Sequence, residues 1–579
     1  MRHPRLVAMA GAGALVLATW TGSAAAAAPS TAAAPTSTGA DEAAGYIVLA
    51  KEGASAEVLA AELRAQGATV TSVNAAVGMV VVSEAGDGFL EAARGLADVQ
   101  GAARNGVIGQ APDDKVAADD VLKEHQAEAA AAATAAPAIP PGPGDPLDPL
   151  LWGMDMMQVP QAHDVTLGDR RVLVGVMDTG IDASHPDLAA NFDANLSRNF
   201  TTDMPDIDGE CETADCVDPN NVDDNEHGTH VAGTIAAAMN GMGVSGVAPN
   251  VTLVNVRAGQ DSGYFFVGPT VNALTYAADA GLDVVNMSFY VDPWLYNCTG
   301  GAPEDSPEAA AEQQTIITAM NRALKYANTG NVTLVGALGN NHEDLSNPRV
   351  DTSSPDFPDG VAYPRTIDND SCVDLPVEGP HVLGISSVGP SGTKADYSNY
   401  ATDVGSGELE FSAPGGWFRD GFGTESYRTN ENLILSAAPL AVLQDLGQVD
   451  EDGNITELGE VLGVQKDCTD NPAPGASNCG YYQYLQGTSM AAPHATGVVA
   501  LLISQKGKVN GRTGFGMSPQ QVRGKLLNTV VAHACPEGGV QSYVQEGRPA
   551  EYTAQCTGNT RHNAIYGWGI VNALNVVQR

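Results

Sequence analysis

Short β-branched apolar runs separated by helical stretches are the dominant pattern of the sequence from about residue 170 onward. The runs lack the apolar–polar alternation of a half-exposed strand, which is typical of parallel strands covered on both faces. The strand-like runs are residues 172–177, 251–256, 284–287, 332–338 and 382–388, and the helical stretches between them include 230–239, 271–280 and 308–326. This alternation predicts an α/β domain built on a buried parallel sheet with right-handed crossover connections.

A smaller unit and a linker precede this domain. Residues 45–108 combine strand-like runs with helically spaced apolar residues, which predicts a small α+β domain that ends in a short strand at 107–108. From residue 127 the sequence turns to Ala and Pro, a composition that builds no core and favours an exposed, partly extended segment. The predicted order is a small domain at 45–108, a linker at 109–147 and a large domain at 148–579.

Residues 1–28 have the order of a secretory signal. Arg2 and Arg5 precede an apolar run at 6–20, and small residues follow at 23–28. A positive start, a short apolar helix and small residues at the cleavage site are the parts of such a signal. The run is short for a membrane span, and no later stretch reaches about 18 uncharged apolar residues. We therefore expect a secreted chain that loses this segment and has no membrane anchor.

The eight cysteines suit an oxidising compartment, and their even number leaves none over. Eight cysteines allow 105 pairings, so the connectivity is open at this stage. Short spacings favour the pairs 211–216, 468–479 and 535–556, with 298–372 as the remainder. A zinc site is the alternative, but the sequence has no CxxC pair and no His-rich tract.

The charge balance is strongly acidic. The chain has 28 Lys and Arg against 69 Asp and Glu, which gives a formal net charge of −41 and a pI near 4.3. Such a field repels phosphate backbones, so nucleic acid is excluded as a partner. The acidic side chains are expected to form a solvated surface that favours solubility and attracts cations.

Three motifs lie at the predicted ends of strands and helices. Asp178-Thr179-Gly180 follows the first strand of the large domain, and two helices open with the segments 227–233 (HGTHVAG) and 487–494 (GTSMAAPH). Ligand sites of open α/β sheets form at the carboxyl ends of the strands, where these motifs are expected to meet. A Ser hydroxyl needs a base to become a nucleophile, a His is a suitable base, and a carboxylate orients the imidazole. The three motifs supply what acyl transfer requires.

The order Asp, His, Ser along the chain is the order found in subtilisin. With these motifs, the sequence resembles the subtilisin-like serine proteases. The resemblance implies that Asp178 orients the base, that His227 is the general base and that Ser489 is the nucleophile. It also implies a three-layer, parallel-sheet α/β catalytic domain preceded by a small α+β propeptide domain. Because the family uses the first His of its motif, His230 is not assigned to catalysis.

A fourth match is Leu338-Gly339-Asn340, at the end of the run 332–338. The family has an Asn here whose amide donates to the oxyanion, so the resemblance implies this role for Asn340. Removing such a donor costs on the order of 100- to 1000-fold in rate. Asn341 follows directly and is the alternative, although the Gly-Asn pattern favours Asn340.

The predicted substrate cleft departs from the family pattern. Asn286-Met287-Ser288 matches the strand that lines the first specificity pocket, but Phe289-Tyr290-Val291 stands where the family often has Leu-Gly-Gly. The usual preference for large apolar substrate residues is therefore not transferred. Ser262-Gly263-Tyr264 is expected to form the edge that pairs with extended substrate. The substrate-binding residues implied by the resemblance are Ser262, Gly263, Ser288, Phe289, Tyr290, Leu338 and Gly339.

The resemblance also implies a structural calcium ion and no organic cofactor. Oxygen ligands from carboxylates, an amide and loop carbonyls suit calcium. The implied ligand residues are Asp148, Asp187, Ala238, Asn240, Met242 and Val244. The alternative is a loop that is closed by hydrogen bonds alone.

Together these features predict a secreted, monomeric serine endopeptidase that acts on protein or peptide substrates and is made as a self-processed zymogen. Residues 45–108 are expected to act as the chain's own inhibitor, and the maturation site is expected between about 110 and 147. One alternative is a processing protease with narrow specificity, for instance one that removes a leader peptide. The other is a binding protein without activity on a protease scaffold, which the complete triad disfavours.

Overall fold

The computed structural model describes the chain from residue 45 to 579, apart from residues 106, 111–143, 290–292, 356–360 and 511–513. The predicted signal sequence at 1–28 and most of the predicted linker lie outside the described residues. No helix among the described residues is long and apolar enough to cross a membrane.

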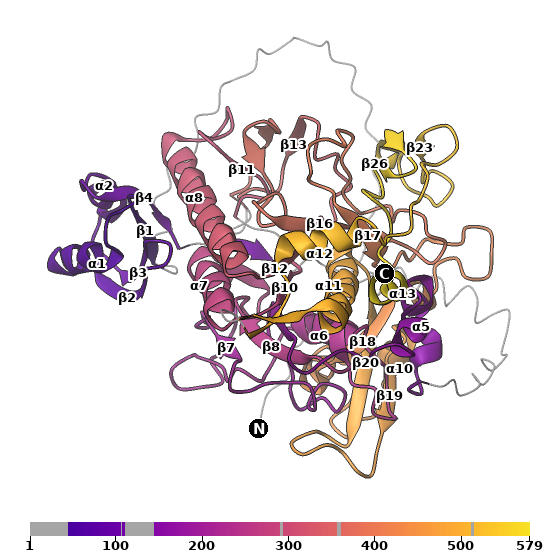
Figure 1. Ribbon diagram of the computed structural model, residues 1–579. Coiled ribbons are helices and arrows are strands. Elements are labelled where there is room, and N and C mark those ends of the chain that lie inside the picture. Colours follow the sequence, from indigo (N-terminus) through magenta and orange to yellow (C-terminus); the bar gives the residue numbers. More distant parts are fainter. Residues whose placement is uncertain (1–44, 106, 111–143, 290–292, 356–360, 511–513) are drawn as a thin grey trace, which may run out of the picture. The chain divides into compact units, whose positions relative to one another are not determined.

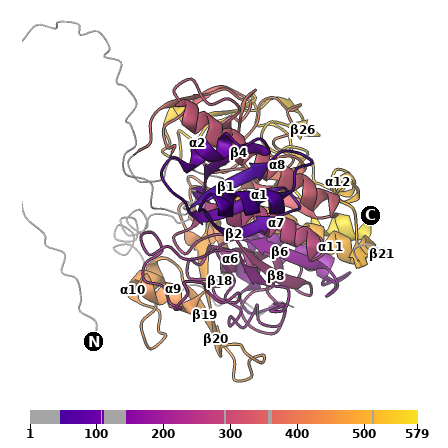
Figure 2. The same cartoon turned by 90° about the vertical axis from the view of Figure 1, so that its left-hand side faces the viewer.

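The small N-terminal domain is α+β, as predicted. Its antiparallel sheet has the strand order β2-β3-β1-β4. The elements are β1 (Tyr46–Ala50), α1 (Ala56–Ala65), β2 (Thr69–Asn74), β3 (Met79–Glu84), α2 (Phe89–Arg94) and β4 (Val99–Arg104). Both helices lie on one face of this sheet (Figures 1 and 2). There Val48, Val80 and Val82 pack with Leu59 and Leu63 of α1 into a core of the domain's own.

The large domain is built on a seven-stranded sheet in which every neighbouring pair is parallel. Its strand order is β17-β16-β12-β10-β6-β8-β7. The strands are β6 (Leu173–Met177), β7 (Arg198–Asn199), β8 (Thr252–Arg257), β10 (Val284–Met287), β12 (Thr333–Ala337), β16 (Val382–Val388) and β17 (Phe411–Pro414). The five predicted runs form the five central strands, and nearly all of their residues are buried, which confirms the predicted parallel sheet.

Helices cover both faces of this sheet and give the domain three layers (Figure 1). On one face, α6 (His227–Ala236) and α11 (Thr488–Lys506) share a core with Val174, Val284 and Ile385 of the strands. On the other face, α7 (Val267–Asp279) and α8 (Pro307–Thr329) pack with Val254, Val285 and Leu334. Apolar side chains alternate between the two cores along each strand, as the pleat of a strand requires.

The remaining elements are shorter and lie in the connections. Near the N-terminal side these are β5 (Val107–Gln110), η1 (Asp148–Leu150), α4 (Trp152–Met156), α5 (Val159–His163), β9 (Tyr264–Phe266), β11 (Asn297–Cys298), β13 (Arg349–Asp351), β14 (Arg365–Ile367) and β15 (Cys372–Val373). Further along are η2 (Asn430–Asn432), β18 (Ile434–Ala438), α9 (Leu440–Asp445), α10 (Glu457–Val461), β19 (Gln465–Cys468), β20 (Cys479–Leu485), β21 (Lys508–Asn510), β22 (Gly514–Gly516) and α12 (Pro519–Leu526). The last are β23 (Val540–Gln541), η3 (Ala550–Tyr552), β24 (Ala554–Gln555), β25 (Gly558–Asn559), β26 (His562–Asn563) and α13 (Ala573–Gln578).

All eight cysteines form disulfides within these connections. The bonds are Cys211–Cys216, Cys298–Cys372, Cys468–Cys479 and Cys535–Cys556, the four pairs that the spacing favoured. No thiol is left for a zinc site. Two of the bonds connect neighbouring strands, β11 with β15 and β19 with β20, and so hold long loops against the sheet domain.

The short strand predicted at 107–108 is present and pairs outside the small sheet. Residues 107–110 form β5, which pairs antiparallel with β9 of the large domain. The small sheet already ends at β4, which pairs with β1 on the inner side. The segment that follows the small domain, β5, therefore pairs with the edge of β9.

Candidate active site

Residues predicted for catalysis or for substrate binding follow neighbouring strands of the sheet. Asp178 comes directly after β6, Ser288 after β10, and Leu338 after β12, and these three strands are adjacent and parallel. The carboxyl ends of parallel strands meet at one edge, so these residues share that edge. His227 and Ser489 are the first and second residues of α6 and α11, the two helices that pack on one face of the sheet.

Asp178 and His227 are joined by a buried hydrogen bond of 2.7 Å between Asp178 Oδ1 and His227 Nδ1. The same carboxylate oxygen accepts the backbone N–H of Thr179 at 2.9 Å. With its Nδ1–H donated to the carboxylate, the imidazole presents Nε2 as the basic nitrogen. A side chain at Gly228 would begin 2.2 Å from the carbonyl oxygen of Gly180, so only glycine lets α6 begin this close to the Asp178 turn.

Ser489 is fixed to the end of β10 by two hydrogen bonds with Ser288. Ser489 Oγ donates to the carbonyl oxygen of Ser288 at 3.2 Å, and Ser288 Oγ donates to the carbonyl oxygen of Ser489 at 2.8 Å. Asn286 Nδ2 donates to Ser288 Oγ at 2.8 Å, which extends the network into the sheet. As the second residue of a 19-residue helix, Ser489 lies where backbone N–H groups and the helix dipole favour negative charge.

Asn340 is held by the residue that precedes the serine. Its Oδ1 accepts both the backbone N–H of Thr488 at 2.9 Å and the hydroxyl of Thr488 at 2.8 Å. The hydroxyl of Thr488 also accepts the backbone N–H of Gly339 at 3.0 Å. These two bonds orient the amide of Asn340 through its Oδ1, and Nδ2 is the donor end of that amide. Asn341 is exposed, and the bonds to Thr488 are made by Asn340.

The other histidines of the motifs are structural. His230 and His494 are buried and hydrogen-bonded to backbone carbonyl oxygens. Burial lowers the pKa of His230 to about 3 and that of His494 to about 4. Both rings are therefore neutral near pH 7 and cannot contribute a charge to the site.

The predicted substrate edge is formed in part as expected. Tyr264 lies in β9, which pairs antiparallel with β5, with Gln110 opposite Tyr264. Ser262 and Gly263 form the turn before this strand, and both the N–H and the Oγ of Ser262 donate to Asp208 Oδ1, at 3.0 and 2.7 Å. The strand edge thus accepts an extended segment, and Ser262 orders the loop that leads into it.

The predicted wall residues divide into buried and undescribed ones. Phe289 is buried and stacks on Phe265 with ring centroids 4.0 Å apart, so it connects β10 to β9 and fills the core. Leu338 is also fully buried. Tyr290 lies outside the described residues.

The loop predicted to hold calcium offers N–H groups to its carboxylates. The backbone N–H of Val244 donates to Asp187 Oδ2 at 3.1 Å, and that of Ser245 donates to Asp148 Oδ1 at 2.7 Å. The hydroxyl of Tyr482 and the Nδ2 of Asn240 donate to Asp187 as well, at 2.9 and 3.1 Å. A calcium ion needs oxygen ligands at these positions. This arrangement does not fit the predicted calcium site and matches the alternative of a loop closed by hydrogen bonds.

Asp145, which the sequence analysis did not select, completes this loop. Its two oxygens accept the backbone N–H groups of Asn240 at 3.2 Å and Gly241 at 2.7 Å. Burial raises the pKa of Asp145, although these bonds oppose the rise. Asp145 and Asp148 thereby attach the start of the large domain to the loop after α6.

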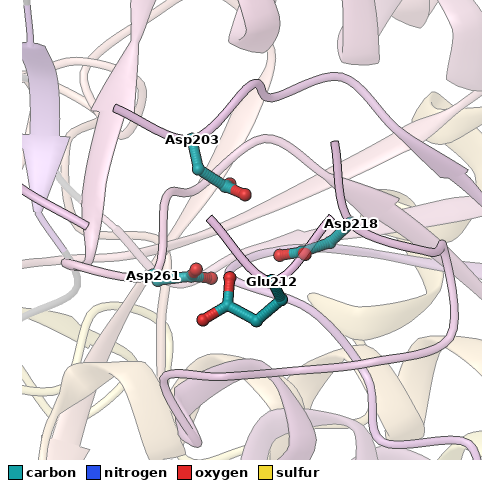
Figure 3. A group of neighbouring side chains, drawn as sticks. All are labelled: Asp203, Glu212, Asp218 and Asp261. Atoms are coloured by element: carbon teal, nitrogen blue, oxygen red, sulfur yellow. The ribbon is translucent and has the colours of Figure 1, made fainter. Parts of the chain in front are cut away.

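A second cluster of carboxylates, in contrast to the loop at Asp187, has few hydrogen-bond donors to its oxygens. The carboxylates of Asp203, Glu212, Asp218 and Asp261 converge so that one oxygen of each lies within 4.8 Å of the others (Figure 3). Asp203 is only 4% exposed, and no described residue donates a hydrogen bond to its oxygens. The sequence alone did not single out this cluster, whose one signal there is the density of acidic residues in 200–225.

A single cation lies among these four carboxylates. Arg257 is fully buried, pairs with Asp218 at 2.9 Å and with Asp261, and lies 3.9 Å from Asp203. Burial and the neighbouring carboxylates raise the pKa of Asp203 to about 6 and that of Asp261 to about 7, against the opposing effect of Arg257. The cluster therefore carries more negative charge than Arg257 can balance, and its oxygens could hold a metal ion.

Comparisons with known proteins agree with this architecture. A model of the Subtilase family matches residues 169–569. Fervidolysin from Fervidobacterium pennivorans is 28% identical over 385 residues, which are 66% of this chain and 40% of fervidolysin. Subtilisin DY from Bacillus licheniformis is 26% identical over 65% of this chain and 90% of its own length.

Two solved structures resemble the fold. The epidermin leader peptide processing serine protease of Staphylococcus aureus has a TM-score of 0.58 at 17% identity, covering 92% of this chain and 97% of that one. The structure of fervidolysin gives 0.54 at 20% identity, over 94% of this chain and 62% of that one. The family model covers well over half of the chain, so this protein belongs to the subtilase family of serine peptidases.

Proposed function

We propose that the mature protein is a secreted serine endopeptidase in which Asp178, His227 and Ser489 form the catalytic triad. The observation that carries the proposal is the buried 2.7 Å bond between Asp178 and His227, at the sheet edge where Ser489 is also fixed. The family sets the class of reaction, and the positions of these side chains support the roles proposed for them.

In the proposed reaction, Ser489 Oγ attacks the carbonyl carbon of a peptide bond while His227 Nε2 takes the hydroxyl proton. Asp178 stabilises the imidazolium that forms. Asn340 Nδ2 and the backbone N–H of Ser489 donate hydrogen bonds to the oxyanion. His227 then gives the proton to the leaving amine, and the acyl group stays on Ser489. Water hydrolyses this ester with His227 as base, which releases the carboxylic acid and restores the hydroxyl.

The proposal includes synthesis as a zymogen. Pairing of β5 with β9 supports it, because β5 leads from the small domain and occupies the edge where extended substrate is expected to pair. The small domain also contacts the large one through Ile47, Leu49 and Met79, which pack with Ile316 and Met320 of α8. Cleavage in the linker, between residues 110 and 147, frees this edge for substrate.

We also propose that structural calcium is bound by the acidic cluster of Asp203, Glu212, Asp218 and Asp261, and not by the loop at Asp187. Carboxylate oxygens are the ligands that calcium prefers, and this cluster has unbalanced negative charge and a buried carboxylate with no hydrogen-bond donor among the described residues. Calcium would supply charge balance to the loop before α6 and takes no part in the chemical steps.

The triad is tested by comparing the wild-type chain with Ser489→Ala. Intact mass should show that wild type loses its N-terminal part up to a residue between 110 and 147, while the variant stays uncut. A serine-directed fluorophosphonate should label mature wild type and leave the variant unlabelled. If wild type is neither cut nor labelled, the protein is a binding protein on a protease scaffold. If both chains are cut alike, another protease performs the maturation, and the labelling result alone decides the assignment of Ser489.

A further inference from the structure

Asp374 is a buried carboxylate that lies close to the catalytic edge. It follows β15 directly, two residues after Cys372, whose disulfide to Cys298 anchors this segment. Its residue is 1% exposed, and neither side-chain oxygen receives a hydrogen bond from any described residue. The catalytic steps proposed above do not use it.

The position of Asp374 is defined by Gly339. A Cβ atom on Gly339 would lie 3.6 Å from Asp374 Oδ2, and the positive φ of 103° also favours glycine there. Gly339 precedes the proposed oxyanion residue Asn340, and its N–H donates to Thr488 beside the nucleophile. The carboxylate of Asp374 therefore lies near the oxyanion segment, beside the amide of Asn399, whose Nδ2 is the atom nearest to that Cβ position.

A bound substrate brings one particular side chain to this place. Its reacting carbonyl must lie between Ser489 and Asn340, because the first attacks it and the second binds its oxygen. The residue that owns this carbonyl, directly before the cleaved bond, therefore has its Cα next to Gly339. A long side chain on that residue extends past Gly339 toward Asp374.

The charges around Asp374 favour a cation. Arg349 is a cation whose charge acts on Asp374, but its Nε pairs with Glu343 at 2.6 Å and its guanidinium stacks on the ring of Tyr296 at 3.9 Å. Glu378 adds a further carboxylate, which accepts the backbone N–H of Asp374. Burial raises the pKa of Asp374 well above its usual range, Glu343 raises it further, and Arg349 opposes the rise. An ionised carboxylate in such a place is costly unless a positive group comes to pair with it.

We propose that Asp374 selects substrates with Lys or Arg directly before the cleaved bond, by pairing with the positive end of that side chain. This inference rests on the proposed peptidase function and gives it a substrate class. It also favours the processing alternative, because cleavage after a basic residue restricts the sequences that can be cut.

The test is hydrolysis of matched fluorogenic peptides that differ only in having Arg, Lys, Leu or Phe before the cleaved bond. Mature wild type should cleave the Arg and Lys peptides with a kcat/KM at least 10-fold above that for Leu and Phe. Asp374→Asn should lower the ratio of the Arg value to the Leu value on the order of 100-fold, since a buried charge partner is lost. The control is Asp370→Asn, an equal change of charge at an exposed position four residues earlier, which should keep the ratio.

Fluorophosphonate labelling of each preparation separates the possible failures. If the enzyme is labelled but prefers Leu or Phe, the inference about Asp374 is wrong and the peptidase function stands. If wild type is neither labelled nor active on any peptide, both proposals fail together. If Asp374→Asn is not labelled, wild type alone tests the inference. It should prefer the Arg and Lys peptides over the Leu and Phe peptides, and a peptide arginine aldehyde should inhibit it more strongly than a leucine aldehyde does.

The chain's own linker provides a second test. Between residues 110 and 147 the only Lys or Arg residues are Lys115 and Lys123. Self-cleavage should therefore leave Val116 or Glu124 as the new first residue, and the double variant Lys115→Gln, Lys123→Gln should stay uncut. A mature N-terminus that follows any other residue in both chains contradicts the basic preference.

Discussion

Thr488 holds Asn340 and Gly339 in place through three hydrogen bonds. Thr488 donates its backbone N–H and its hydroxyl to the same oxygen of Asn340, and its hydroxyl oxygen accepts the N–H of Gly339. The amide proposed to bind the oxyanion is thus oriented before substrate arrives. Preorganised donors of this kind need no rearrangement at the moment of reaction, which is why they lower the barrier so effectively.

Replacing Asn340 tests this arrangement at the scale of one side chain. Asn340→Ala should lower kcat on the order of 100- to 1000-fold with a much smaller change in KM, because the lost hydrogen bond acts on the transition state. Asn341→Ala is the matched control, since Asn341 is the exposed neighbour and should retain nearly full kcat. Steady-state kinetics on one peptide substrate measure both. Equal losses in the two variants would show that the assignment of the amide donor is wrong.

At the scale of elements, two loops treat their carboxylates in opposite ways. The loop after α6 turns a series of backbone N–H groups toward Asp145, Asp148 and Asp187, which neutralises them with fixed dipoles. The loop before α6 leaves Asp203 without such donors, and Arg257 of β8 is the cation that pairs with the neighbouring carboxylates Asp218 and Asp261. A cation from solution is therefore expected to bind near Asp203 more favourably than in the loop after α6.

Removal of calcium should therefore act through the loop before α6. After treatment with EDTA, added Ca²⁺ should raise the Tm of the uncleaved Ser489→Ala chain. Calcium at 100 times its Kd contributes about 2.7 kcal/mol. Adding Asp203→Asn should abolish most of this shift. Adding Asp206→Asn, a change at an exposed residue of the same loop, should preserve it. Thermal unfolding followed by circular dichroism measures all three chains, and a calcium response that survives Asp203→Asn would exclude the cluster as the binding site.

At the scale of the whole molecule, the small domain uses the two faces of its sheet differently. One face builds the domain's own core with α1 and α2, and the other contributes to the core beneath α7 and α8. Polar contacts rim this interface. Arg322 of α8 donates to the carbonyl oxygens of Ala50 and Val77 at 2.9 and 3.0 Å, and Arg104 pairs with Glu312 at 3.1 Å.

Weakening this rim should speed activation. Arg322→Ala removes both bonds to the small domain, so the proposed zymogen should release its N-terminal part faster after cleavage and gain activity sooner. Lys325→Ala changes an exposed cation on the same helix and serves as the control. The lag before peptide hydrolysis begins is the quantity to compare. An unchanged lag in Arg322→Ala would mean that release does not limit activation.

The sequence predicts the parallel sheet and the positions of the catalytic motifs, because each depends on local pattern. Short spacing favours the disulfides 211–216, 468–479 and 535–556, whereas 298–372 was only the remaining pair and the connectivity as a whole stayed open. Buried β-branched runs such as 284–287 become strands wherever they lie, and Asp178, His227 and Ser489 are placed by the ends of such elements. The partner of β5 is not local information, so the pairing of residues 107–110 with β9 could not be predicted from the sequence.

The two carboxylate clusters could not be predicted for a similar reason. Whether a loop turns its N–H or its C=O groups toward a carboxylate depends on its backbone dihedral angles. The residue types at 238–245 do not determine these angles. Asp203 and Asp261 are distant in sequence and meet only through the fold. Asp374 belongs to no motif, and in a chain with many acidic residues the sequence does not distinguish a buried one from the exposed ones.

The pairing of β5 with β9 has a consequence for how activity depends on concentration. In the proposed zymogen, β5 competes for the β9 edge as a tethered ligand, at an effective concentration of about the millimolar range that no free substrate is expected to match. Once the linker is cut, the same segment competes only at its bulk concentration, which falls with every dilution. Dilution after the proposed secretion would then complete the activation that cleavage begins. A concentrated preparation of cleaved protein would stay partly inhibited until it is diluted.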